Sequence, residues 1–199
     1  MVEYRSVPSM RMKIKDVFSM SDLFRNMNDW FKENYYTHEQ VGTDFTENAQ
    51  EVLYTHILRS GGTFLDAWVW WRLVRYPFDT DPKTGYFRYR INVDMHFLGD
   101  PKEMDIVHKG KKVPVNKMEV EITINSVLEM DYNNTWKKDK LMGVIHDVFR
   151  KKMYWHQVTD YFNLMHDDVY RFHAMLKQFF KLESVHPEET VPWYPKGLN

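Results

Sequence analysis

The feature that most constrains the fold is a change in the period of the hydrophobic residues along the chain. Between residues 51 and 130, apolar and polar side chains alternate with a period of two, which is typical of strands with one buried face. Turn sequences such as Ser60-Gly61-Gly62 separate the runs, and the runs at 86–98 and 117–130 are the most regular. After Asp131 the period becomes helical. The sequence therefore predicts an antiparallel sheet followed by long helices.

The N-terminal region is predicted to add a strand and a helix within residues 9–36. Met10, Met12 and Ile14 alternate with basic residues, and this pattern suits a sheet edge because lysines discourage further strand pairing. In the segment that follows, apolar side chains recur at helical spacing and form one stripe: Leu23, Phe24, Met27, Trp30 and Phe31. We expect Ser21 to be the N-cap of this helix.

These patterns predict an α+β fold: an antiparallel meander sheet of about four to five strands, packed on an N-terminal helix and long C-terminal helices. The expected domain spans residues 1–184, with the sheet at 51–130 and the C-terminal helices at 135–183. Residues 185–199 contain three prolines, which exclude regular structure and predict an extended tail. This order of elements is similar to the helix-grip arrangement, in which a curved sheet wraps a helix and often leaves a ligand cavity.

The last predicted helix carries a heptad series. Its apolar residues step by alternating fours and threes: Val158, Phe162, Met165, Val169, Phe172, Leu176 and Phe179. Such a seam suits a coiled coil with a partner helix, and it equally suits docking on the sheet. Asp167 and Asp168 lie beside this seam, and we expect both to pair with Arg171 on the helix surface.

Composition excludes several classes of function. The 27 basic and 28 acidic residues give a net charge of −1, so the chain lacks the basic field that gathers nucleic acid or an anionic membrane. It has no cysteine, which excludes disulfides and thiolate catalysis. No apolar run is long enough to span a membrane or to form a signal peptide. We expect a protein that is cytoplasmic or virion-associated, neither secreted nor membrane-spanning, with no cofactor.

Three of the seven tryptophans lie in the stretch TFLDAWVWWRLVRYP at residues 63–77. A period of two places Trp71 in the core, whereas Trp68 and Trp70 point to the opposite face of the sheet. A turn that pairs Tyr76 with Tyr86 predicts three cross-strand neighbours on that face: Asp66 with His96, Trp68 with Asp94, and Trp70 with Asn92. Three interpretations of this face stay open: a cover made by a C-terminal helix, a protein interface, and a ligand platform.

The same face holds the nearest approach to a catalytic or metal-binding cluster. Asp66, Asp94 and His96 could combine with Glu119 or Glu121, but alternate residues on a strand lie about 7 Å apart, which separates the ligands of one ion. A solvated sheet face therefore explains these residues better, and we assign no catalytic or metal-ligating residue. The predicted residues that bind a partner or ligand are Trp68, Trp70, Asp66, Asp94 and His96, with Trp193 and Tyr194 in the tail.

Two segments carry a resemblance to known proteins. KIKDVFSMSDLFRNMNDWFKENYY near the start and VPVNKMEVEITINSVLEMDYNNTW before the C-terminal helices resemble an uncharacterised group of small archaeal or archaeal-virus α+β proteins. That group has no assigned activity, so the resemblance implies an origin and implies no functional residue.

The sequence favours a non-enzymatic assembly or interaction protein that buries aromatic and heptad-helix surface against partner subunits. Such partners would form a homo-oligomer or a larger complex, without nucleic acid or membrane. A first alternative is a helix-grip module that binds a small apolar ligand, with one set of candidate lining residues: Trp71, Phe87, Tyr89, Ile91 and Phe97. A second alternative is a hydrolase or metal enzyme that uses Asp66, Asp94 and His96.

Overall fold

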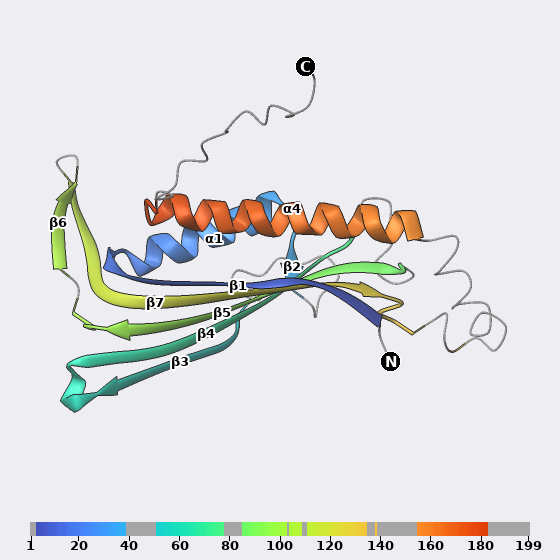
Figure 1. The fold of residues 1–199 in the computed structure, drawn as a ribbon. Coiled ribbons are helices and arrows are strands. Elements are labelled where there is room, and N and C mark those ends of the chain that lie inside the picture. Colours follow the sequence, from blue (N-terminus) through green and yellow to red (C-terminus); the bar gives the residue numbers. More distant parts are fainter. Residues whose placement is uncertain are drawn as a thin grey trace, which may run out of the picture.

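The computed structural model describes residues 3–38, 51–77, 85–102, 104–108, 111–134, 138 and 155–182. Their elements follow one another in this order: β1 (Glu3–Phe18), α1 (Met20–Glu33), β2 (Thr37–His38), β3 (Glu51–Arg59), the 3-10 turn η1 (Ser60–Gly62), β4 (Phe64–Arg75), β5 (Phe87–Gly99), β6 (Met104–His108), β7 (Lys111–Met130) and α4 (Trp155–Phe179). Seven antiparallel strands form the sheet, with both helices on one side of it (Figure 1). The predicted α+β class is confirmed, although the sheet has more strands than the four to five expected.

The sheet runs in the order β1, β7, β5, β4, and both β2 and β3 pair with the remaining edge of β4. The predicted meander is present as β3, β4 and β5, whose neighbours in sequence are also neighbours in the sheet. A small hairpin is formed by β6, which pairs with the first residues of β7. That hairpin rises away from the rest of the sheet, because β7 bends along its length (Figure 1).

The first strand is longer than predicted. β1 begins at Glu3 rather than near Met10, and it pairs with β7 over nearly its whole length. Its register shifts between Val7 and Met10, where Pro8 interrupts the alternation. Proline lacks the N–H that a ladder requires, so it is tolerated at a bulge of an edge strand. β1 lies at the edge of the sheet, as the basic residues beside Met12 and Ile14 predict.

The helix α1 begins two residues earlier than the sequence indicated. Its N-cap is Ser19, whose Oγ accepts a hydrogen bond from the backbone N–H of Asp22 at 3.2 Å. Ser21, the predicted N-cap, lies inside the first turn. Both serines precede apolar residues, but only Ser19 has an acidic residue three positions later, the spacing of a capping box.

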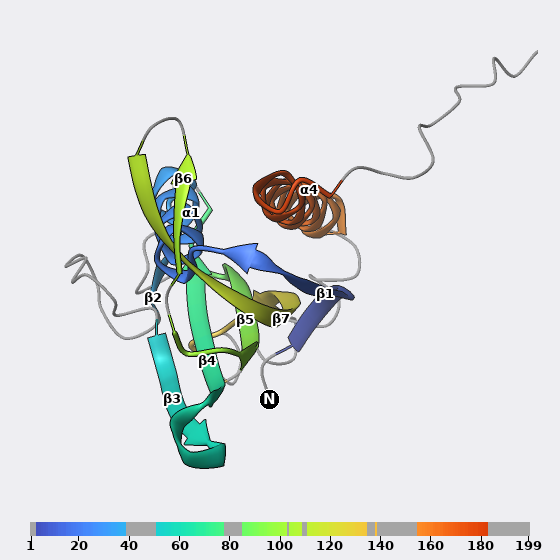
Figure 2. The same ribbon diagram turned by 90° about the vertical axis from the view of Figure 1, so that its left-hand side faces the viewer.

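One hydrophobic core joins the helices to the inner face of the sheet. The α1 stripe is buried as predicted at Leu23, Met27 and Phe31, and it meets α4 where the rings of Phe31 and Phe172 lie 4.6 Å apart. The heptad series is buried in this same core, so α4 docks its seam on the sheet and α1 of its own chain. The end-on view shows α1 and α4 on the same side of the twisted sheet (Figure 2).

Several predicted features lie outside the part of the chain that the structure describes. These are the first part of the predicted C-terminal helices, up to Tyr154 except Lys138, and the tail from residue 183 onward. The predicted boundary between domain and tail therefore lies there too, as do Trp193 and Tyr194.

Candidate interaction surface

The sheet face opposite to α1 and α4 carries no element among those that the structure describes (Figure 1). We call it the outer face. Four large apolar side chains gather on it where β3 pairs with β4, and each is between 39% and 48% exposed. We call this set the aromatic band, and its members are Ile57, Phe64, Trp68 and Trp70. Trp71 points the other way and is buried against Phe24 of α1, as the period of two predicts.

The register beside the tryptophans differs by two residues from the prediction. Trp68 lies opposite His96 and Trp70 lies opposite Asp94. Asn92 therefore pairs with Arg72 instead of Trp70. A slip of two residues leaves every side chain on its predicted face, so the alternation of polar and apolar residues could not distinguish the two registers.

Trp68 is held in place by a chain of polar contacts. Its ring stacks on the imidazole of His96, with ring centroids 3.8 Å apart and an interplanar angle of 13°. The Nε2 atom of His96 lies 2.9 Å from Oδ1 of Asp66, and the other carboxylate oxygen pairs with Nη2 of Arg59 at 2.5 Å. Asp66 is buried beneath these partners. Arg59 is not among the predicted residues of this face, although its place just before the hairpin turn sets it beside Asp66.

Trp70 has a separate partner. The guanidinium carbon of Arg72 lies 5.5 Å from the centroid of the Trp70 ring, within the range of a cation–π interaction. Nη1 of Arg72 also pairs with Oδ1 of Asp94 at 2.6 Å. Each tryptophan ring therefore contacts a neighbouring side chain and is still partly exposed. Because these contacts restrict the rings before binding, a partner that covers them loses less affinity to side-chain ordering.

The carboxylates of the outer face are each paired with a different cation. Glu119 pairs with Nζ of Lys13 at 2.7 Å, and Glu121 pairs with Arg11. The hydrogen bond from Arg11 is the main cause that lowers the pKa of Glu121. Within the described ranges, no three or more histidine, aspartate or glutamate side chains are placed to hold a metal ion. Of the three residues of the predicted cluster, Asp66 and His96 therefore contact each other, whereas Asp94 pairs with Arg72.

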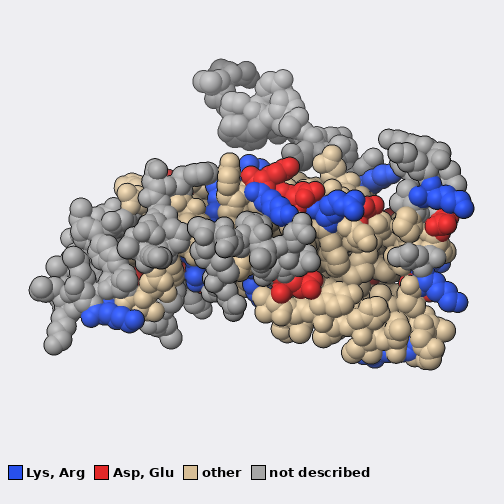
Figure 3. Space-filling model, turned by 180° about the vertical axis from the view of Figure 1, so that it is seen from behind, with Lys and Arg blue, Asp and Glu red and all other residues tan. Residues whose placement is uncertain are grey.

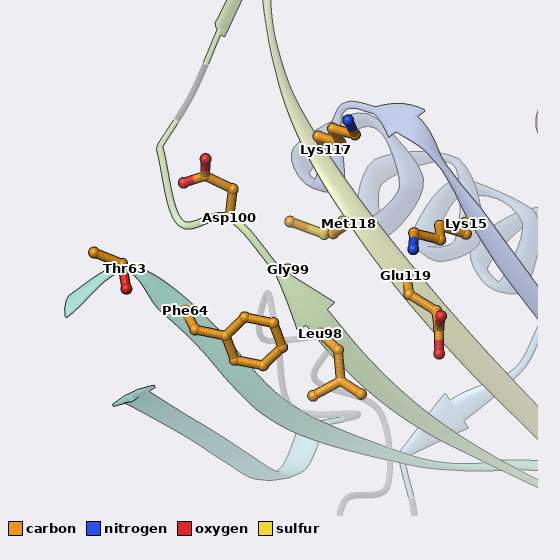
Figure 4. Close-up of a pocket in the computed structure, with 9 residues that line it drawn as sticks. All are labelled: Lys15, Thr63, Phe64, Leu98, Gly99, Asp100, Lys117, Met118 and Glu119. Carbon is orange, nitrogen blue, oxygen red and sulfur yellow. The ribbon is translucent and has the colours of Figure 1, made fainter. Parts of the chain in front are cut away.

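A pocket of about 420 Å³ adjoins the aromatic band where β5 ends (Figure 4). It shares Phe64 with the band, and Leu98 and Lys117 are also among its lining residues. Gly99 lets the backbones of β5 and β7 approach closely beside the pocket, because a Cβ atom there would lie 2.6 Å from the Cα of Met118 on β7. A side chain at this position would push the two strands apart.

No protein-family model matches this sequence, and no curated protein matches it. Nor is any helix in the described part of the chain long and apolar enough to cross a membrane. The function is therefore inferred from the geometry of the molecule.

The structure overturns one prediction about α4. Asp168 is not a surface residue: it is 2% exposed and lies against the sheet. It does pair with Arg171, as expected, but it also accepts hydrogen bonds from Nη1 of Arg75 at 2.5 Å and from the hydroxyl of Tyr36 at 3.0 Å. Its position three residues after Met165 and four before Phe172 places it on the buried stripe, a signal that was present in the sequence.

Proposed function

We propose that this protein is a non-enzymatic assembly component, which works by burying the aromatic band of its outer face against partner protein subunits. The observation that carries the proposal is the exposure of Trp68 and Trp70, 41% and 39% respectively, on a sheet face over which no described element lies. Tryptophan is enriched at the energetic centres of protein interfaces, because one ring combines a large apolar area with a hydrogen-bond donor.

Covering this surface contributes favourable free energy to a contact with a partner. A buried tryptophan removes roughly 150–250 Å² from water, so covering the exposed two fifths of one ring stabilises a complex by about 2 kcal/mol. Ile57 and Phe64 extend the same surface along β3 and β4. His96 and Arg72 hold the tryptophan rings in orientation before a partner arrives, which lowers the entropic cost of binding.

The pocket beside Phe64 supports the same function. Side chains that anchor an interface commonly fill pockets on the partner, and this pocket combines apolar Phe64 and Leu98 with Lys117. By contrast, the heptad seam contributes nothing to the proposed surface, because its residues are packed in the core of the same chain.

A ligand-binding function between the sheet and the helices has less support. The five candidate lining residues are all buried, and rings from the helices pack directly on them. Phe24 contacts both Trp71 and Phe97 with ring centroids under 6 Å apart, and Tyr161 lies 4.8 Å from Phe87. The pocket of Figure 4 includes none of these residues.

The test is the mass in solution of the parent protein and of a Trp68→Ala/Trp70→Ala variant, measured by sedimentation equilibrium over a range of concentrations. We expect the parent to associate at micromolar concentration and the double variant to associate at least about tenfold more weakly. Tyr170→Ala is the matched control, because Tyr170 is a similarly exposed aromatic residue that also contacts a histidine ring, His166, but lies on α4. A parent protein that stays monomeric at about 100 μM would contradict the proposal.

A further inference from the structure

The two edges of the sheet differ in how they are protected from pairing with another strand. At the β1 edge, Arg11, Lys13 and Lys15 are exposed on the outer face, and such charges discourage a further strand. β3 pairs with β4, and no strand among those described pairs with its other edge. Between its two ends, β3 has the sequence VLYTHIL, without one lysine, arginine, aspartate or glutamate. The space-filling view from behind shows a nearly uncharged area over β3 and β4, at the lower right (Figure 3).

This edge exposes apolar side chains on both faces of the sheet. Tyr54 and Leu58, which pair with the inward residues Val69 and Leu65, are 47% and 53% exposed. Ile57, on the outer face, is 48% exposed. A long apolar edge strand recruits another strand, because its backbone N–H and C=O groups and its side chains all lack cover.

The sequence of β3 is complementary to itself when it is read in the antiparallel direction. We propose that a second copy of this chain covers the edge, with β3 paired to β3 across a two-fold axis that passes between the two Thr55 residues. The inference rests on the proposed function and adds to it a contact between two copies of the chain, beside the aromatic band. In this register Thr55 faces Thr55, Tyr54 faces His56, Leu53 faces Ile57, and Val52 faces Leu58.

The facing pairs from Val52 to Leu58 match in character: aliphatic residues meet one another, threonine meets threonine, and a tyrosine meets a histidine. Glu51 and Arg59 take no part, because the bulge sets Glu51 opposite the inward Trp71, whereas Arg59 lies opposite the outward Phe64 and pairs with Asp66. Neighbouring symmetric registers lose the match: a centre at Tyr54 sets His56 against Val52, and a centre at His56 sets Leu53 against Arg59. The bulge between Glu51 and Leu53 lies at one end of the strand, so the central pairs around Thr55 are regular.

Pairing at the β3 edge would also bring the aromatic bands of the two copies side by side. A two-fold axis perpendicular to the sheet keeps each side chain on its own face, so outer residues meet outer residues. The two sheets become one, with the helices of both copies on the same side. On the other side, Leu53 and Ile57 of the two copies join the two aromatic bands into one larger surface, available to further subunits.

Disulfide cross-linking tests the register, because the protein contains no cysteine of its own. In the first mixture, the variants Leu53→Cys and Ile57→Cys are purified separately, combined so that subunits can exchange, and then gently oxidised. The second mixture treats Tyr54→Cys and His56→Cys in the same way. Successive cross-strand pairs alternate between Cα separations of about 4.5 and 5.5 Å, both within disulfide range, so one mixture tests the close type and the other the wide type. Thr55→Cys, at the symmetry axis, should link without a partner variant.

We expect each mixture to give linked dimers containing about half of the chains, the statistical share of mixed dimers, while Leu53→Cys or Ile57→Cys alone gives few. Leu58→Cys alone is the control for random collision, because it is exposed but faces Val52 in this register. Equal linking by single variants and mixtures would overturn the proposed register. A parent protein that associates in solution while neither mixture links would refute the β3 contact and leave the proposed function standing. A parent protein that remains monomeric would refute both.

Discussion

Arg75 of β4 donates a hydrogen bond to Asp168 of α4 at 2.5 Å, across 93 residues of sequence. The same carboxylate accepts a hydrogen bond from the hydroxyl of Tyr36, which follows α1, and pairs with Arg171. A single buried acid therefore connects the C-terminal helix, the sheet and the end of the first helix. Because a charge buried without a partner destabilises the fold, the carboxylate of Asp168 requires its partners to stay in place.

Replacing Asp168 should destabilise the fold much more than replacing its neighbour. Asp168→Asn leaves the Arg75 guanidinium beside a neutral amide in a mostly buried site, and we expect a loss of about 3 kcal/mol in the free energy of unfolding. Asp167→Asn removes an identical group whose side chain is 72% exposed, and should change stability by less than about 0.5 kcal/mol. Urea unfolding of both variants at pH 7 measures the difference, and equal effects would show that the buried cluster contributes little.

Buried tyrosines predict a loss of stability at alkaline pH. Burial is the main cause that raises the pKa of both Tyr36 and Tyr89 above the usual value for tyrosine. Below about pH 10 both states keep these protons; above it the unfolded chain releases them and the folded protein does not, so stability falls by up to about 1.4 kcal/mol per pH unit for each residue. Urea unfolding between pH 8 and 11 should show the decline.

Tyr36→Phe separates the two contributions of that hydroxyl. At pH 7 the variant should be less stable by about 2 kcal/mol, because a hydrogen bond to a charged acceptor is lost. Above pH 10 the difference from the parent should narrow, since phenylalanine has no proton to release. Tyr35→Phe, at an exposed adjacent position, should preserve the pH dependence of the parent. A constant difference across the whole pH range would contradict the assignment of Tyr36 as a titrating buried group.

Truncation of the neighbouring tryptophans Trp70 and Trp71 should lower stability by very different amounts. Trp71→Ala opens a cavity against Phe24 and Phe31, and should lower the free energy of unfolding by about 3–5 kcal/mol. Trp70→Ala removes a ring that is already partly in water, and should cost about 1 kcal/mol or less. Thermal or urea unfolding of the two single variants checks this contrast. A large loss of stability in Trp70→Ala would indicate that the outer face is part of the fold rather than a surface for partners.

Local periodicity predicted much of the fold but less of the site. The strands, the stripe of α1 and the burial of the α4 seam all follow from spacings that a single element imposes on its own side chains. The predicted N-cap lies two residues late because two serines precede the same apolar run, and the acidic residue three positions later that marks a capping box follows Ser19 and not Ser21. The length of β1 was underestimated, since Pro8 interrupts its pattern at a bulge that an edge strand tolerates.

By itself, the sequence determined which face of the sheet the alternating side chains of β4, β5 and β7 occupy, including the division between Trp71 and the pair Trp68 and Trp70. Tertiary structure decided the rest: the register that stacks Trp68 on His96, the burial of Asp168 against Arg75, and the side of the sheet that both helices cover. The physical reason is the distance along the chain over which each feature is determined. The direction of a side chain depends on the backbone of its own strand, whereas register and cover depend on contacts between residues far apart in the chain.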